Sequence, residues 1–89
     1  MLRLTVISET PEEVVLKVEG RVSDESVALL EHEGARWLRK VRCLVLDLTG
    51  VQFIGRMGIA LLKRWSCERL VLRGGSPFVR SLLTTHGLD

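Results

Sequence analysis

Two glycine-containing segments near the middle of the chain are the best candidates for binding chemistry. Asp47-Leu48-Thr49-Gly50 ends an apolar run typical of a buried strand, and Gly55-Arg56-Met57-Gly58 opens a helical pattern. In open α/β sheets, ligands usually dock at the carboxyl ends of parallel strands, where the next helix offers free backbone N–H groups. The second segment places a cation, Arg56, and a large apolar side chain, Met57, between its glycines. The alternative is that the glycines serve only a tight turn and that Met57 packs inward.

Motifs of catalytic and metal sites are absent from the sequence. There is no G-x-S-x-G elbow, H-E-x-x-H pair, Walker loop or G-x-G-x-x-G fingerprint, and no nucleophile–base pair or carboxylate pair can be assembled. His32 stands between glutamates, which favours a solvated side chain, and His86 is placed to bond free carbonyls at the end of the last helix. Two distant histidines with Cys43 and Cys67 make a poor zinc site. We therefore expect no enzyme, no metal and no cofactor.

Length and composition predict one small globular domain. The chain has 89 residues, of which 46% are hydrophobic and 27% are charged, so disorder is not expected. A net charge of +2 is too weak to imply a nucleic-acid or membrane partner. No segment has the length and apolar character of a membrane span, and the N-terminus alternates like a strand rather than a signal peptide. We therefore expect a cytoplasmic protein without membrane insertion, in which Cys43 is a small buried hydrophobe, Cys67 lies in a loop and no disulfide joins them.

Basic and aromatic residues gather where the first helix is expected to end. The cations are Arg36, Arg39, Lys40 and Arg42, with Trp37 as the one aromatic residue among them. Acidic residues earlier in the same helix offset this charge, so a solvated helix end is favoured over a nucleic-acid site. Trp37 and Trp65 suit either partner anchors or core packing, and core packing is favoured.

Hydrophobic periodicity predicts a β-β-α-β-α-β-α order. We expect strands over 2–8, 14–22, 42–48 and 70–73, and helices over 27–41, 59–65 and from Pro77 to a stop at Gly87 and Leu88. The first two strands form an antiparallel hairpin, and each later strand–helix–strand unit pairs in parallel, which gives a mixed α/β sheet with helices packed on it. Ser23 or Asp24 is expected to cap the first helix and Ser76 the last. Gly34 costs the first helix about 1 kcal/mol relative to alanine and marks either a kink or a close contact.

These segments together resemble the STAS domain. The resemblance covers nearly the whole chain in the right order, and it is specific in combination rather than through any single piece. It is carried by Gly20-Arg21-Val22, by residues 44–54 (LVLDLTGVQFI), by Gly58-Ile59-Ala60-Leu61-Leu62, and by residues 76–83 (SPFVRSLL) with Gly87-Leu88.

The resemblance implies a non-catalytic module typified by the anti-sigma factor antagonists of bacterial signalling. Those proteins bind an anti-sigma factor that is also a kinase. The kinase phosphorylates a serine at the N-terminus of the second helix, and the phosphate switches binding off. Related modules serve in stress-signalling complexes, beneath anion transporters and as small subunits of lipid-transport systems.

The chain departs from this family at the switch itself. The family motif reads Asp-Ser-Ser-Gly, whereas Gly55, Arg56 and Met57 precede Gly58 here. Met57 occupies the phosphoacceptor position and has no hydroxyl, and Thr49 is only a weak substitute. We therefore expect a docking surface without a phospho-switch. The expected role is regulation of transcription through protein–protein interaction. Its predicted residues are Arg21, Ser23, the 49–53 loop with Thr49, Gln52 and Phe53, and the turn of Gly55, Arg56, Met57 and Gly58.

Two alternatives and one departure in length remain open. The module could instead be an accessory subunit of a lipid or anion transporter, or a small-ligand or nucleotide sensor that uses Arg56 and the helix N-terminus. Family members commonly continue into another strand and helix, so residues 1–89 are expected to form a single domain without those last elements. The open edge or helix face would then suit a homodimer.

Overall fold

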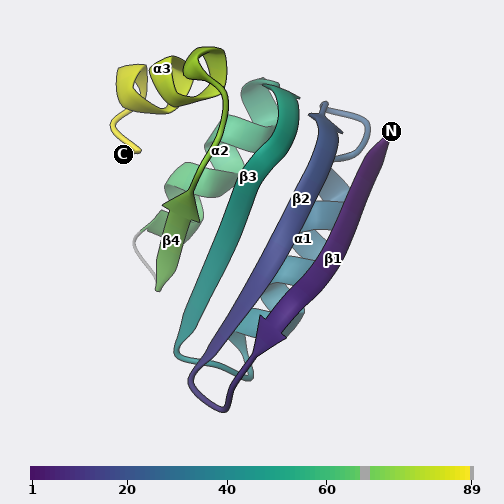
Figure 1. Cartoon of the computed structure of the whole chain (residues 1–89). Coiled ribbons are helices and arrows are strands. Elements are labelled where there is room, and N and C mark those ends of the chain that lie inside the picture. Colours follow the sequence, from purple (N-terminus) through teal and green to yellow (C-terminus); the bar gives the residue numbers. More distant parts are fainter. Residues whose placement is uncertain (67–68, 89) are drawn as a thin grey trace.

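A four-stranded mixed sheet forms the centre of the computed structural model, which describes residues 1–66 and 69–88 (Figure 1). Its strands are β1 (Leu2–Glu9), β2 (Glu13–Val22), β3 (Cys43–Ile54) and β4 (Leu70–Arg73), in the order β1-β2-β3-β4. β1 and β2 are antiparallel, whereas β3 pairs in parallel with both β2 and β4. The predicted hairpin and the two predicted parallel pairings are confirmed.

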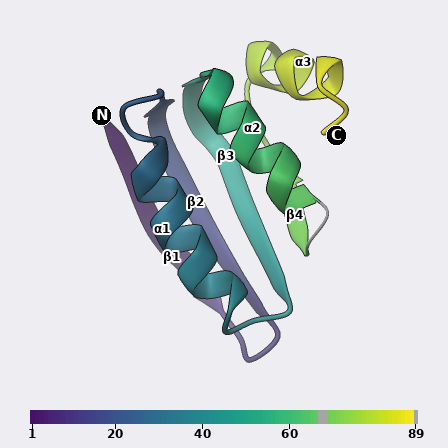
Figure 2. The same cartoon turned by 180° about the vertical axis from the view of Figure 1, so that it is seen from behind.

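Two of the three helices cover one face of this sheet. Helices α1 (Val27–Leu38) and α2 (Arg56–Ser66) lie side by side in front of the strands in Figure 2. The third helix, α3 (Pro77–Thr85), lies near the end of the sheet where β3 stops (Figure 1). The order β-β-α-β-α-β-α and the mixed sheet with packed helices are therefore confirmed. None of the described helices is both long enough and apolar enough to cross a membrane.

The core lies between the sheet and helices α1 and α2. Strand alternation places Val14, Leu16 and Val18 of β2 on the helix side, where each is almost completely buried. Trp37 and Trp65 both belong to the same buried cluster. The two tryptophans therefore pack in the core and are not exposed as partner anchors.

The structure corrects the end of the central strand. β3 continues through residues 49–53, which we predicted to be a loop, and it ends at Ile54. The β2–β3 ladder shifts register at two places, between Lys17 and Glu19 and between Gly20 and Arg21, so the pairing bulges and then resumes. A Cβ on Gly50 would lie 2.9 Å from Cγ of Glu19. Gly50 therefore permits a close approach of β2 within the strand and does not end it.

The bounds of the first two helices also differ from prediction. α1 ends at Leu38 rather than at Val41, and its N-cap is Ser26 rather than Ser23 or Asp24. α2 begins at Arg56, before the predicted start at 59. Ser23 instead belongs to the preceding turn, in which the backbone N–H groups of Ser26 and Val27 donate to its carbonyl oxygen.

Both predicted ends of α3 are confirmed. Oγ of Ser76 accepts a hydrogen bond from the N–H of Val79 at 3.2 Å, and proline occupies the first turn. At the other end Gly87 has φ of 72°, and the N–H of Leu88 donates to the carbonyl of Leu83 at 2.8 Å.

The predictions for the cysteines have different outcomes. Cys43 is half-buried rather than buried, since it begins β3 on the face away from the helices. Cys67 lies outside the described residues.

Candidate functional site

Met57 projects outward where β3 passes into α2. Its side chain is 52% exposed, so the alternative that it packs inward is wrong. It lines a shallow groove between α1 and α2, together with Val27 and Ala60. The first turn of α2 therefore presents a large flexible apolar side chain to solvent, next to the exposed Arg56.

A carboxylate from a remote turn caps α2. Oδ1 of Asp24, which lies between β2 and α1, accepts a hydrogen bond from the N–H of Met57 at 3.2 Å across 33 residues of sequence. Gly55 precedes the helix and has no side chain with which to cap it, and a Cβ there would lie 3.1 Å from the same oxygen. Asp24 thus places a negative charge at the positive end of the helix dipole. The sequence alone predicts a cap of α1 by Asp24, because a cap from a distant turn leaves no local signal.

Removal of the Asp24 carboxylate is expected to destabilise the protein. Asp24→Ala should lower the free energy of unfolding by about 1 kcal/mol, because it removes a capping acceptor. Asp24→Asn should lower the free energy of unfolding by less, since the amide oxygen can still accept the hydrogen bond. Urea denaturation of these variants, with Glu25→Ala as the control for a neighbouring exposed carboxylate, measures the effect. Equal losses for Asp24→Ala and Glu25→Ala would mean that the cap contributes nothing.

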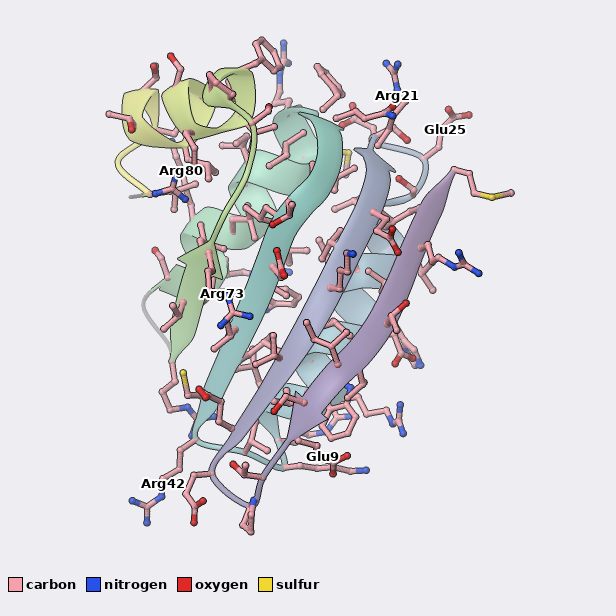
Figure 3. All side chains as sticks on the ribbon, viewed as in Figure 1. Glu9, Arg21, Glu25, Arg42, Arg73 and Arg80 are labelled. Carbon is pink, nitrogen blue, oxygen red and sulfur yellow. The ribbon has the colours of Figure 1, made fainter. Side chains whose placement is uncertain are left out.

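Arg21 and Phe53 bring the ends of β2 and β3 together beside this helix. They are partners in the parallel ladder, and the Arg21 guanidinium carbon lies 5.3 Å from the centre of the Phe53 ring. Arg21 projects from the end of β2 (Figure 3). Oγ of Ser23 lies 3.1 Å from Oγ of Ser26, a contact that holds the turn carrying Asp24. The predicted residues Arg21, Ser23 and Phe53 therefore do lie at the same end of the sheet as Met57.

The two predicted glycines, Gly55 and Gly58, are buried and offer no surface of their own. The N–H of Gly55 donates to the carbonyl of Val22 at 2.7 Å, which ties the start of α2 to the end of β2. A Cβ on Gly58 would lie 2.8 Å from Cγ1 of Val22 and 2.9 Å from Cγ2 of Ile54. These glycines therefore position the exposed residues by letting α2 approach the two strands closely.

Thr49 is not part of this cluster. It precedes Ile54 by five positions in β3, which is about 16 Å of strand. Leu44, Leu46 and Leu48 face the core, so alternation places Thr49 on the opposite face of the sheet. Its hydroxyl donates to Oδ1 of Asp47 at 2.6 Å. Gln52 is exposed near the end of the same strand.

Hydrogen bonds from Thr49 set the ionisation of Asp47. The Thr49 hydroxyl and, at 3.0 Å, its backbone N–H lower the pKa of Asp47 below its usual 3.8, and Arg73 adds a smaller effect. Arg73 reaches over β3 on the helix-free face, with Nη2 4.0 Å from Oδ2 of Asp47 (Figure 3). Because the folded state lowers this pKa, the stabilisation is present above pH 3.8 and is lost as pH falls below it.

A separate cavity lies on the other side of α2, between α2 and α3. Its volume is about 330 Å³, and Phe53, Arg56, Phe78 and His86 are among its lining residues. The side chain of Phe78 is 57% exposed, so it forms a rim of the cavity and not part of the core. A helix of nine residues has too few turns for its periodicity to distinguish a rim position from a core position. Among the described residues, no three His, Cys, Asp or Glu side chains are placed to hold a metal ion.

Comparison with known proteins identifies relatives of this arrangement. The family model described as "Mlab, STAS domain" matches residues 5–89. A search of curated proteins by sequence gave no match.

Solved structures show the same fold. An anti-sigma factor antagonist from Mycobacterium paratuberculosis is 27% identical with a TM-score of 0.79, and the match covers 100% of this chain and 80% of that one. The anti-sigma factor antagonist SpoIIAA in its unphosphorylated form is 20% identical with a TM-score of 0.77, over 99% of this chain and 82% of that one. The phosphorylated form of SpoIIAA from Bacillus is 19% identical with a TM-score of 0.70, over 99% of this chain and 85% of that one.

Proposed function

The chain belongs to the STAS domain family, and from this premise we propose that it is a non-catalytic protein-interaction module that binds its partner without a phospho-switch. We place it with the bacterial signalling modules that resemble anti-sigma factor antagonists. Solved structures of anti-sigma factor antagonists share its fold, which supports the class. The expected partner is an anti-sigma factor or kinase, within the cytoplasm.

Exposure of Met57 is the observation that supports this proposal. We call Arg21, Phe53, Arg56 and Met57 the Met57 surface. It joins an exposed apolar side chain to a half-buried aromatic ring and two cations. Methionine and arginine are enriched in the centres of protein interfaces, and methionine adapts its shape to a partner. A thioether cannot accept a phosphoryl group, so we infer that binding at this surface is constitutive.

Capping by Asp24 argues against the alternative of a nucleotide or anion sensor that holds its ligand on the backbone N–H groups at the start of α2. Such a sensor would bind its anion at the N-terminus of α2, where backbone N–H groups and the dipole attract negative charge. The Asp24 carboxylate already accepts the hydrogen bond of the Met57 N–H at that point.

A transporter-associated subunit would also bind through protein contacts, so the identity of the partner separates it from a signalling antagonist.

The Met57→Glu variant tests the proposal. The tagged protein is used to capture partners from lysate of its own host, and the captured protein is identified and purified for titration against each variant. We expect Met57→Glu to weaken binding by about tenfold or more, because it buries a carboxylate at the centre of the contact. Val71→Glu is the matched control. Val71 is similarly exposed, at 46%, but lies on the face of the sheet away from the helices.

Outcomes of this titration are distinct. Release by Met57→Glu with retention by Val71→Glu supports docking at the Met57 surface. If the same partner binds Met57→Glu as tightly as the wild type, the docking site lies elsewhere and the proposal is wrong. A captured kinase would favour the signalling role, and a captured permease or transport ATPase would favour the transporter role.

A further inference from the structure

The cavity between α2 and α3 has the dimensions of a small ligand site. This open pocket of about 330 Å³ is bordered by the end of β3, the start of α2 and the length of α3. Pockets that bind small molecules in proteins have volumes of roughly 300–1,000 Å³, so this one is large enough for a single compact ligand. The cavity and the groove that Met57 lines are on opposite sides of α2, and Phe53 and Arg56 belong both to the cavity lining and to the Met57 surface.

Apolar side chains from three elements form most of the cavity wall. Phe53 contributes from β3, Ile59 from α2, and Phe78 and Leu82 from α3. Phe78 is 57% exposed on the rim, so much of its side chain is in contact with solvent. An apolar group that enters the cavity would remove this ring and Leu82 from water, and burial of apolar surface is the main driving force of such binding.

Charge at the cavity comes from two residues. Among the residues that the structure describes, Arg56 and His86 are the ionisable ones that line it. Arg56 is exposed and makes no ion pair among the residues that the structure describes. The imidazole of His86 supplies an N–H donor in either of its protonation states. None of the carboxylates within residues 1–66 and 69–88 lines the cavity, and the neighbouring Asp24 carboxylate is bonded to the Met57 N–H.

We propose that this cavity binds a small amphipathic carboxylate. The apolar body of the ligand lies between Phe78, Leu82 and Ile59, and the carboxylate points out of the apolar wall toward Arg56 and His86. A guanidinium pairs with a carboxylate through charge-assisted hydrogen bonds, which are stronger than those to a neutral hydroxyl. A neutral ligand of the same shape would gain only the apolar contacts, and a cationic one would be repelled by Arg56.

Three probes of one shape test this proposal by two-dimensional NMR of the full chain. They are 4-phenylbutyrate, 4-phenylbutan-1-ol and 4-phenylbutylamine. We expect saturable shifts with the carboxylate, confined to amides around Phe53, Ile59, Phe78 and Leu82. The carboxylate should bind about fivefold to tenfold more tightly than the alcohol, as one charge-assisted hydrogen bond predicts. The amine should bind more weakly than the alcohol.

Variants separate the charge from the apolar wall. Arg56→Gln should remove most of the preference for the carboxylate while leaving binding of the alcohol unchanged within about twofold. Phe78→Ser should weaken the carboxylate and the alcohol alike, and its exposed position makes misfolding of the variant unexpected. Val71→Ser, an exposed apolar residue outside the cavity, is the control and should change nothing.

Several results would overturn the proposal. They are the absence of saturable shifts with the carboxylate, shifts that arise elsewhere on the fold, or an alcohol that binds as tightly as the acid. In the last case the cavity is an apolar contact surface, such as one that receives a partner's side chain. No partner protein takes part in this experiment, so its failure leaves the proposed function untouched.

Discussion

Gly34→Ala is expected to lower the free energy of unfolding by about 2–3 kcal/mol, although alanine is normally favoured over glycine in a helix by about 1 kcal/mol. A Cβ at this position of α1 would lie 2.7 Å from Cζ3 and 2.9 Å from Cζ2 of Trp65 on α2. The Trp65 ring is 5% exposed and fixed in the core, so it cannot move aside as a surface side chain would. The extra methyl group must therefore push the two helices apart.

A double-mutant cycle measures this contact directly. Urea unfolding is followed for the wild type, Gly34→Ala, Trp65→Phe and the double variant. Phenylalanine is shorter than tryptophan and leaves room for the methyl group. The double variant should therefore be more stable than the sum of the single losses predicts, by about 1 kcal/mol or more.

The control for helix propensity is Ala28→Gly, at an exposed site of the same helix, which should cost about 1 kcal/mol. If Gly34→Ala stabilised the protein instead, α1 and α2 would not be in contact through this glycine.

The role of Gly34 also illustrates which parts of the fold could be read from the sequence. Periodicity identified α1 and α2 separately, because each pattern is local to its helix. The sequence alone leaves open whether Gly34 marks a kink or a close contact. That choice depends on Trp65, which is far away in the sequence and meets the glycine only after both helices have packed on the sheet.

The candidate site was predictable to a similar extent. The turn before α2 followed from its glycines and from the position after a central strand, and the structure places Arg21, Phe53 and Arg56 at that end of the molecule. The direction of Met57 and the cap from Asp24 were not predictable, because both depend on how the turn after β2 lies against α2. The prediction that residues 49–53 form a loop was wrong for a related reason. Bulges in the β2–β3 ladder depend on the neighbouring strand, and they have no pattern within β3 itself.

Gly58→Ala is expected to lower the free energy of unfolding by about 2 kcal/mol. It should also displace the Met57 surface, although Gly58 is not one of the residues of that surface. The new methyl group would meet Cγ1 of Val22 at 2.8 Å and Cγ2 of Ile54 at 2.9 Å. Those side chains are 2% and 3% exposed, so relief must come from a shift of the first turn of α2 away from the strands. That turn carries Met57 and its hydrogen bond to Asp24.

Two readouts separate this effect from ordinary loss of stability. Urea unfolding gives the free energy, and the NMR shift of the Met57 amide reports its hydrogen bond to Asp24. Addition of Val22→Ala, which removes one of the two contacted methyl groups, should recover part of the stability lost in Gly58→Ala and return the amide toward its wild-type shift. Lys63→Ala, at an exposed position nearer the end of the same helix, is the control and should change the Met57 amide little.

If Gly58→Ala costs stability but leaves the Met57 amide unmoved, the helix start is not held by this packing. In that case Gly58 is a core residue only. If the NMR shift of the Met57 amide changes and partner binding weakens in proportion, Gly58 controls the Met57 surface by setting the position of the first turn of α2. The structure favours the second outcome, because the short approach of α2 to Val22 and Ile54 is what sets the height of Met57 above the ends of both strands.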